Sequence, residues 1–137
     1  MPEVGGVLET ALYVDDVERS ARFYRELFDF ETLEEDQRFG AMSVAGKQVL
    51  LLFRKGGTTS PIVLPGGVIP SHDGTGTTHF AFSIAAADWA YWEERLRERG
   101  IPIESVVRWP RGGRSMYFRD PDGHLAELVT PGCWAIW

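Results

Sequence analysis

Hydrophobic and polar positions switch from a strand-like to a helix-like period twice along the chain. The first alternating stretch places one set of side chains on one face of a predicted strand and a second set on the other: Leu8, Thr10, Leu12 and Val14 against Glu9, Ala11 and Tyr13. A helix is predicted over residues 17–28, with Asp15 or Asp16 as its cap. Strands are then predicted within 38–46 and 48–53, and 31–37 adds the edge of another.

The second half of the chain repeats this order. In "THFAFSI", His79, Ala81 and Ser83 share one face, and Phe80, Phe82 and Ile84 share the other. A helix over about 88–99 ends at Gly100, and strands follow in "IPIESVVRWP", "RSMYFRD" and "HLAELVT", the last two joined by the turn "DPDG". Glu9 and His79 therefore hold equivalent positions, and each helix is expected on the sheet face opposite them.

The repeat defines the predicted architecture. We expect an α+β fold built from two βαβββ modules within a single domain, 1–137, with module one at about 5–55 and module two at about 77–131. Residues 54–76 between them are rich in Gly, Pro, Thr and Ser and read as a long irregular loop. Its apolar part, "PIVLPGGVIP", packs either over a pocket or on a neighbouring subunit, and its His72 is expected to be mobile and only a weak ligand candidate.

Composition narrows the classes of partner. The chain has 137 residues and a net charge of -6, which disfavours nucleic acid and anionic membranes as partners and favours small molecules. No apolar run approaches the roughly 20 residues that span a bilayer, and no secretory signal is visible. Cys133 is the only cysteine, which suits a reducing compartment. We therefore expect a cytoplasmic protein that acts on a small molecule.

Three polar residues stand on the strand faces turned away from the predicted helices: Glu9, His79 and Glu127. Glu127 lies among apolar neighbours on its strand, where an unpaired carboxylate is costly. Two half-buried carboxylates repel each other unless a cation or shared protons intervene, and an imidazole beside them completes a nitrogen and oxygen site for a divalent metal. The alternative is that each carboxylate pairs with an arginine and His79 binds water.

The paired modules, with "HFAF" opening the second and "YFRDPDGHLAEL" closing it, resemble the vicinal oxygen chelate superfamily. This superfamily includes glyoxalase I, fosfomycin-resistance proteins, extradiol dioxygenases and bleomycin-resistance proteins. The resemblance covers nearly the whole chain, and "THFAFSIAAAD" is most similar to the fosfomycin-resistance branch. It implies a cupped mixed sheet with helices on the outer face, and one divalent ion (Mn, Fe, Ni, Co, Zn or Mg) held by Glu9, His79 and Glu127. It also implies a homodimer in which one subunit provides Glu9 and the other provides His79 and Glu127.

The chain also differs from the individual branches of this superfamily at several site positions. Fosfomycin-type and dioxygenase-type members usually have histidine where this chain has Glu9, and two histidines with one carboxylate form the Fe(II) set that activates oxygen. Glyoxalase I has a further glutamate where "VLLLF" offers leucine, and Ala11 replaces the threonine of fosfomycin thiol transferases. Dioxygenase and glyoxalase I activities are thus disfavoured, and the substrate and reaction type stay open.

Tyr117 matches the substrate-side tyrosine of the fosfomycin-resistance proteins and is the candidate catalytic residue; a plain packing role is the alternative. One of Arg111, Arg114 and Arg119 is a candidate to hold a carboxylate or phosphonate, and no general base is assigned. We expect a metal-dependent lyase, isomerase or transferase. The alternative function is a metal-free drug-binding protein with aromatic walls such as Tyr13, Trp109 and Tyr117. Open apolar walls and the tail "CWAIW" also favour a homodimer.

Overall fold

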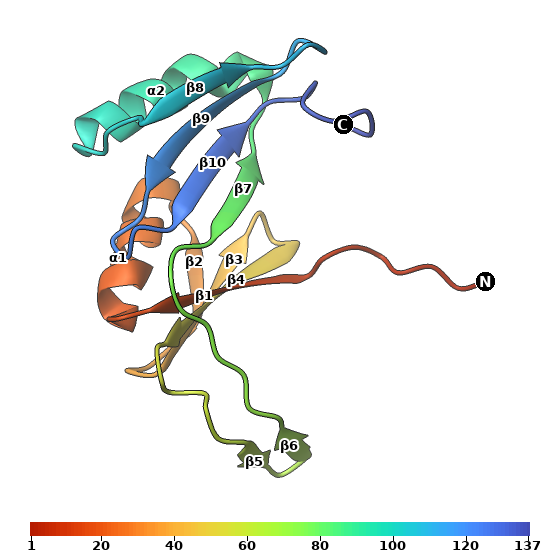
Figure 1. Cartoon of the computed structure of the whole chain (residues 1–137), viewed down its shortest axis with the longest axis vertical. Coiled ribbons are helices and arrows are strands. Elements are labelled where there is room, and N and C mark those ends of the chain that lie inside the picture. The colour runs from red at the N-terminus through yellow and green to blue at the C-terminus, as the bar shows by residue number, and fades with distance from the viewer. The chain divides into compact units, whose positions relative to one another are not determined.

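The computed structural model describes residues 1–137. These residues form two compact units, Met1–Gly76 and Thr77–Trp137 (Figure 1). The first unit holds helix α1 and four strands of one mixed sheet: β1 (Glu9–Val14), α1 (Val17–Phe28), β2 (Glu31–Glu35), β3 (Phe39–Val44) and β4 (Gln48–Arg54). The sheet order is β1-β4-β3-β2, in which β1 and β4 run parallel and the other pairs run antiparallel. The predicted helix and strands of module one are confirmed.

Helix α1 packs on the sheet face that carries Leu12. In register, Leu12 lies beside Leu52, which lies beside Gly40, and a Cβ on Gly40 would come within 3.2 Å of Val17 Cγ1. The absence of a side chain at Gly40 therefore lets the first turn of α1 approach the sheet. Asp16 caps this helix by accepting a hydrogen bond from the Arg19 amide, 3.1 Å away. Glu9, Ala11 and Tyr13 face the other way, as predicted.

The second unit repeats the order of the first. Its elements are β7 (His79–Ser83), a 3₁₀ turn (Ala86–Asp88), α2 (Trp89–Glu98), β8 (Ser105–Arg108), β9 (Arg114–Arg119) and β10 (Leu125–Val129). The sheet order is β7-β10-β9-β8, again with one parallel pair, β7 and β10. The repeat of two βαβββ modules is confirmed.

Helix α2 begins against the sheet face opposite His79. The guanidinium of Arg114 lies 4.3 Å from the centre of the Trp89 ring at the start of α2. Arg114 shares its strand face with Met116 and Phe118, both fully buried, and strand alternation directs Tyr117 to the other face. The face that carries His79 and Tyr117 is thus left free of the helix.

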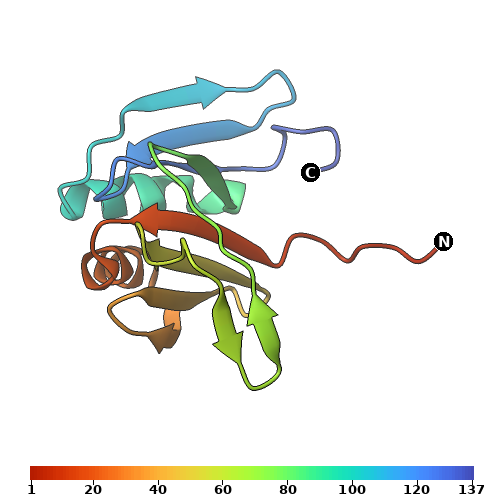
Figure 2. The same ribbon diagram turned by 60° about the horizontal axis from the view of Figure 1, so that its bottom comes forward.

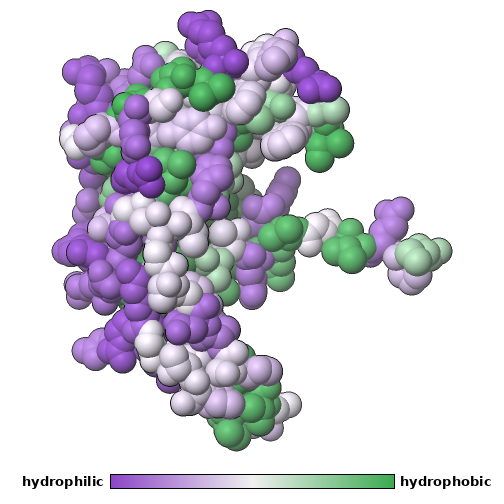
Figure 3. All heavy atoms as spheres, in the orientation of Figure 1, coloured by the Kyte–Doolittle hydropathy of each residue, from purple (hydrophilic) through white to green (hydrophobic).

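The segment between the modules is more ordered than the sequence suggests. It forms an antiparallel hairpin of β5 (Ile62–Leu64) and β6 (Gly67–Ile69), so the expectation of an irregular loop is wrong there. β-branched residues on both sides of "PGG" supply strand propensity around a tight turn. The hairpin stands away from the sheet of its own unit (Figure 2), and hydrophobic side chains gather at its end (Figure 3), with Val63 80% exposed.

His72 is held in place rather than free to move. Its backbone N–H donates to the Thr58 carbonyl at 2.9 Å, and the Thr58 hydroxyl donates to the His72 carbonyl at 2.5 Å. Its Nδ1 also lies 2.6 Å from the Tyr13 hydroxyl. The expected mobility of His72 therefore does not fit these contacts. Neither helix of the protein has the length and apolar character needed to cross a bilayer.

Candidate functional site

A cavity of about 330 Å³ opens on the helix-free face of the second unit. Its walls combine two polar side chains with a largely aromatic and apolar lining: His79, Ala81, Trp109, Tyr117, Glu127, Val129, Cys133 and Trp134. Strand register explains the gathering, because Glu127 on β10 lies directly between Ala81 on β7 and Tyr117 on β9. The structure thus brings together His79, Glu127 and Tyr117, as the sequence predicts.

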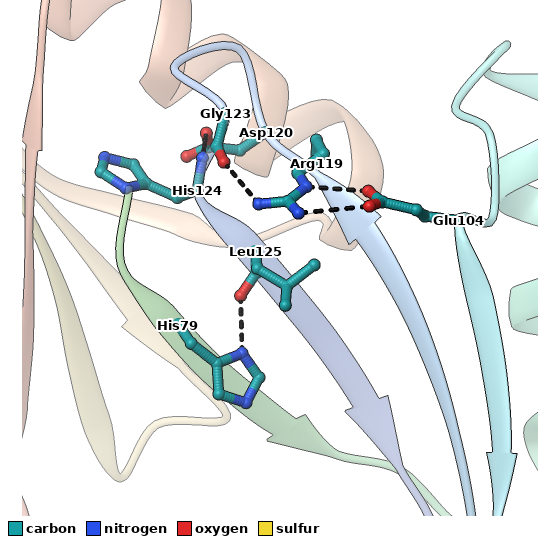
Figure 4. A network of polar contacts seen from close by, with 7 residues as sticks. All are labelled: His79, Glu104, Arg119, Asp120, Gly123, His124 and Leu125. Atoms are coloured by element: carbon teal, nitrogen blue, oxygen red, sulfur yellow. Dashed lines mark hydrogen bonds and ion pairs between the residues drawn. The ribbon is translucent and has the colours of Figure 1, made fainter. Parts of the chain in front are cut away.

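The His79 imidazole has a fixed orientation. Its Nδ1 lies 2.9 Å from the carbonyl oxygen of Leu125, the neighbouring residue on β10 (Figure 4). A carbonyl oxygen only accepts hydrogen bonds, so Nδ1 donates and carries a proton. In the neutral ring Nε2 then has a free lone pair, which is the form that binds metals. That nitrogen lies 3.2 Å from Glu127 Oε2.

Glu127 is buried, with 6% of its surface exposed, and its two oxygens have different surroundings. Oε1 accepts a hydrogen bond from the buried Ser115 hydroxyl, whereas Oε2 faces His79 Nε2. A lone pair and a carboxylate at this distance repel each other unless a proton or a cation lies between them. The donor set therefore fits a divalent cation of the kind that binds imidazole and carboxylate together.

Tyr117 lies beside this pair, its ring centre 6.0 Å from that of His79. Burial raises the pKa of its hydroxyl most, and the negative charge of Glu127 raises it further, whereas a smaller effect of the Ser115 hydroxyl lowers it. The net effect disfavours the phenolate. Tyr117 therefore keeps its proton at neutral pH and can donate a hydrogen bond into the cavity.

Glu9 lies in the first unit, exposed at the start of β1 on the face that α1 leaves free. Neither unit on its own gathers three or more His, Cys, Asp or Glu side chains in a way that would hold a metal ion. The role of Glu9 as a third ligand stays a prediction.

Two of the three candidate arginines, Arg114 and Arg119, have partners outside the cavity. Arg119 forms a two-pronged pair with Glu104, at 2.8 and 3.2 Å, and also donates to the Gly123 carbonyl at 3.1 Å (Figure 4). Arg114 stacks on Trp89 on the helix-covered face. Glu127 accepts a hydrogen bond from Ser115 and lies 3.2 Å from His79 Nε2, so the alternative in which it pairs with an arginine is wrong.

Sequence reasoning missed Ser115, Cys133 and Trp134. Alternation along β9 places Ser115 on the same face as Tyr117, so the sequence of this strand could have indicated that Ser115 lies near the site. Cys133 and Trp134 lie in a C-terminal segment without strand or helix periodicity, and nothing in the sequence directs them to this cavity.

Comparison with known proteins identifies the family. The model of the Glyoxalase/Bleomycin resistance protein/Dioxygenase superfamily matches residues 6–128. The chain belongs to this superfamily. This confirms the resemblance seen in the sequence, and the paired βαβββ modules are the fold of its members.

The names of individual relatives state several different activities. Metallothiol transferase FosB of Bacillus licheniformis is 30% identical over 126 residues, covering 91% of this chain and 75% of that protein. The crystal structure of lactoylglutathione lyase from Agrobacterium tumefaciens is 32% identical, with a TM-score of 0.87 and coverage of 98% and 99% of the two chains. The fosfomycin resistance protein FosX from Mesorhizobium loti has 25% identity, a TM-score of 0.64 and coverage of 93% of each chain.

Proposed function

We propose that this superfamily member is a divalent-metal-dependent enzyme of the vicinal oxygen chelate type, acting on a small oxygen-rich molecule. The observation that carries the proposal is the position of His79 Nε2, which lies 3.2 Å from Glu127 Oε2 in a largely apolar cavity while Nδ1 bonds to the Leu125 carbonyl. In this proposal His79 and Glu127 hold the ion, and Glu9 is the third ligand, from its own or a partner chain.

The reaction belongs to the lyase, isomerase or transferase class and resembles that of the fosfomycin-resistance branch. The names metallothiol transferase FosB, FosX and lactoylglutathione lyase among the relatives support this range. Glu9, in place of the histidine usual in dioxygenase-type members, disfavours oxygen activation by Fe(II).

The imidazole and the aromatic side chains of the cavity have distinct roles in this proposal. A bound divalent ion supplies Lewis-acid polarisation of a substrate oxygen. The Leu125 carbonyl keeps the proton of His79 on Nδ1 and so leaves Nε2 available. Tyr117 donates its hydroxyl proton in a hydrogen bond to a substrate oxygen, because its raised pKa keeps it neutral. The rings of Trp109 and Trp134 contact the apolar part of the substrate.

The proposal includes a homodimer in which modules of two chains complete each site. Exposed apolar side chains at the C-terminus support it, since Trp134 is 71% and Ile136 is 95% exposed. A cytoplasmic location stays a prediction that rests on the single cysteine.

The second candidate is a metal-free binding protein of the bleomycin-resistance kind. The aromatic lining by Trp109, Tyr117 and Trp134 favours it, because such walls also suit a flat apolar drug. Tyr13, also expected as a wall residue, lies in the other unit with its hydroxyl bonded to His72.

Elemental analysis separates the two candidates. The protein is purified without chelator and without a metal-carrying affinity tag, and its metal content is measured after dialysis. The enzyme proposal predicts a retained divalent ion. Metal-free protein that does not take up added Mn²⁺, Co²⁺, Ni²⁺ or Zn²⁺ would favour the binding protein instead.

A further inference from the structure

A chain of hydrogen bonds runs from the cavity wall to the back of Glu127. The indole Nε1 of Trp109 lies 2.8 Å from the Ser115 hydroxyl oxygen, and that hydroxyl bonds to Glu127 Oε1. Ser115 is fully buried, so water does not compete for its hydroxyl. Trp109 directly follows β8, Ser115 lies on β9 and Glu127 lies on β10, all within the second unit.

The donors and acceptors permit one direction only. An indole N–H donates and never accepts, so Trp109 uses a lone pair of the Ser115 oxygen. A carboxylate only accepts, so the single hydroxyl proton of Ser115 points to Glu127. The Ser115 hydroxyl is therefore fixed from both sides, and its bond to the carboxylate is a charge-assisted one, stronger than a neutral bond.

This arrangement distinguishes the two carboxylate oxygens. Oε1 is tied to Ser115 inside the sheet, and Oε2 is left facing His79 Nε2 at 3.2 Å. No buried side-chain nitrogen or oxygen of the protein lacks a hydrogen-bond partner, and the bonds of Ser115 are part of this arrangement. The orientation of Oε2 is thus preset by Ser115, which does not line the cavity itself.

We propose that Ser115 is a positioning residue that aims Glu127 Oε2 into the candidate metal site, with Trp109 holding the Ser115 hydroxyl in place. The inference rests on the proposed function, because Glu127 is one of the residues proposed there to hold the ion. Ser115 acts through its bond to Glu127, and Trp109 links this support to the wall of the cavity.

Local backbone geometry brings Trp109 within reach of Ser115. The Trp109 amide donates to the Gly113 carbonyl at 2.8 Å, and the Gly112 amide donates back to the Trp109 carbonyl at 2.9 Å. Gly112 has φ +95°, which a side chain would disfavour. The tight turn "WPRGGRS" therefore folds the indole back over β9, which explains why a residue six positions away contacts Ser115.

The test is a titration of the metal-free protein with CoCl₂, followed by visible absorption of the bound ion and by equilibrium dialysis. Ser115→Ala should weaken Co²⁺ binding by about 10- to 100-fold, the usual cost of losing a group that orients a metal ligand. Ser115→Thr, which keeps the hydroxyl, should restore binding. Trp109→Phe, which keeps a ring but removes the N–H, should weaken binding less than Ser115→Ala and alter the absorption bands.

Ser83→Ala is the matched control, because Ser83 is an exposed serine on the same face of the same sheet. It should bind Co²⁺ like the wild type. Thermal unfolding of each metal-free variant separates lost stability from lost positioning.

The outcomes are distinct. A lowered melting temperature in Ser115→Ala with unchanged Co²⁺ affinity would assign Ser115 a purely structural role and overturn the inference. If Ser115→Ala does not fold, Trp109→Phe decides, and wild-type affinity and spectrum in that variant would overturn it. Failure of the wild type to bind Co²⁺, Mn²⁺, Ni²⁺ or Zn²⁺ would instead reject the proposed function, and the inference with it.

Discussion

At the scale of single residues, the Tyr117 hydroxyl makes the stability of the fold depend on pH. Burial and the charge of Glu127 raise its pKa, so the folded protein favours the neutral phenol. A raised folded-state pKa gives a contribution to stability that is complete below the unfolded value of about 10 and is lost as pH rises through the folded value.

Tyr117→Phe removes that titration. Between roughly pH 8 and 11, the melting temperature of the wild type should fall more steeply than that of Tyr117→Phe. Tyr91→Phe, on an exposed position of α2, is the control and should follow the wild type. Parallel curves for the wild type and Tyr117→Phe would contradict the assigned environment of this hydroxyl.

The sequence allowed His79, Glu127 and Tyr117 to be placed on one face, because strand alternation is a property of the local chain. The sequence could not predict that the Ser115 hydroxyl donates a hydrogen bond to one oxygen of Glu127. Nor could it predict that the Leu125 carbonyl fixes the tautomer of His79. Those contacts depend on which strands are neighbours and in what register, and the pattern of a single strand does not contain that information.

At the scale of elements, the turn between β8 and β9 fits tightly against the C-terminal segment. A Cβ on Gly113 would lie 2.5 Å from the Gly132 carbonyl carbon and 2.7 Å from the Cys133 nitrogen. These neighbours are backbone atoms, which cannot turn aside as a flexible side chain does. The contact holds Cys133 and Trp134 beside the cavity.

Gly113→Ala should therefore lower the free energy of unfolding by about 1–3 kcal/mol, as overpacking usually does. Gly66→Ala is the control, because a Cβ there meets nothing within 4 Å. Chemical denaturation of both variants measures the difference. Equal stability of Gly113→Ala and the wild type would show that this segment does not pack as described.

Both helices and the eight strands of the two modules followed from hydrophobic periodicity, which is strong for long amphipathic elements. The hairpin of β5 and β6 did not, because Gly and Pro dominate the composition of its segment and each strand has only three residues. Two or three apolar residues beside a turn are too short a run for alternation to be recognised.

At the scale of the whole molecule, exposed apolar side chains favour self-association. Val63 and Val68 on the hairpin are 80% and 59% exposed, and Ile136 near the C-terminus is 95% exposed. Burial of such surface is the main driving force of stable homodimers. Sedimentation equilibrium should give twice the chain mass at micromolar concentration, and a monomer under those conditions would contradict the proposed dimer.

If His79 and Glu127 hold a divalent ion, the metal content of the protein depends on the charge of Glu127, and matched glutamine variants measure this dependence. Glu127→Gln keeps an oxygen that can accept from Ser115 but removes the charge that faces His79. Glu104→Gln removes an equal charge from the same unit at the Arg119 pair, away from the cavity. Elemental analysis should find metal in the wild type and in Glu104→Gln, and only background in Glu127→Gln. Undiminished metal in Glu127→Gln would show that Glu127 is not a ligand of the ion.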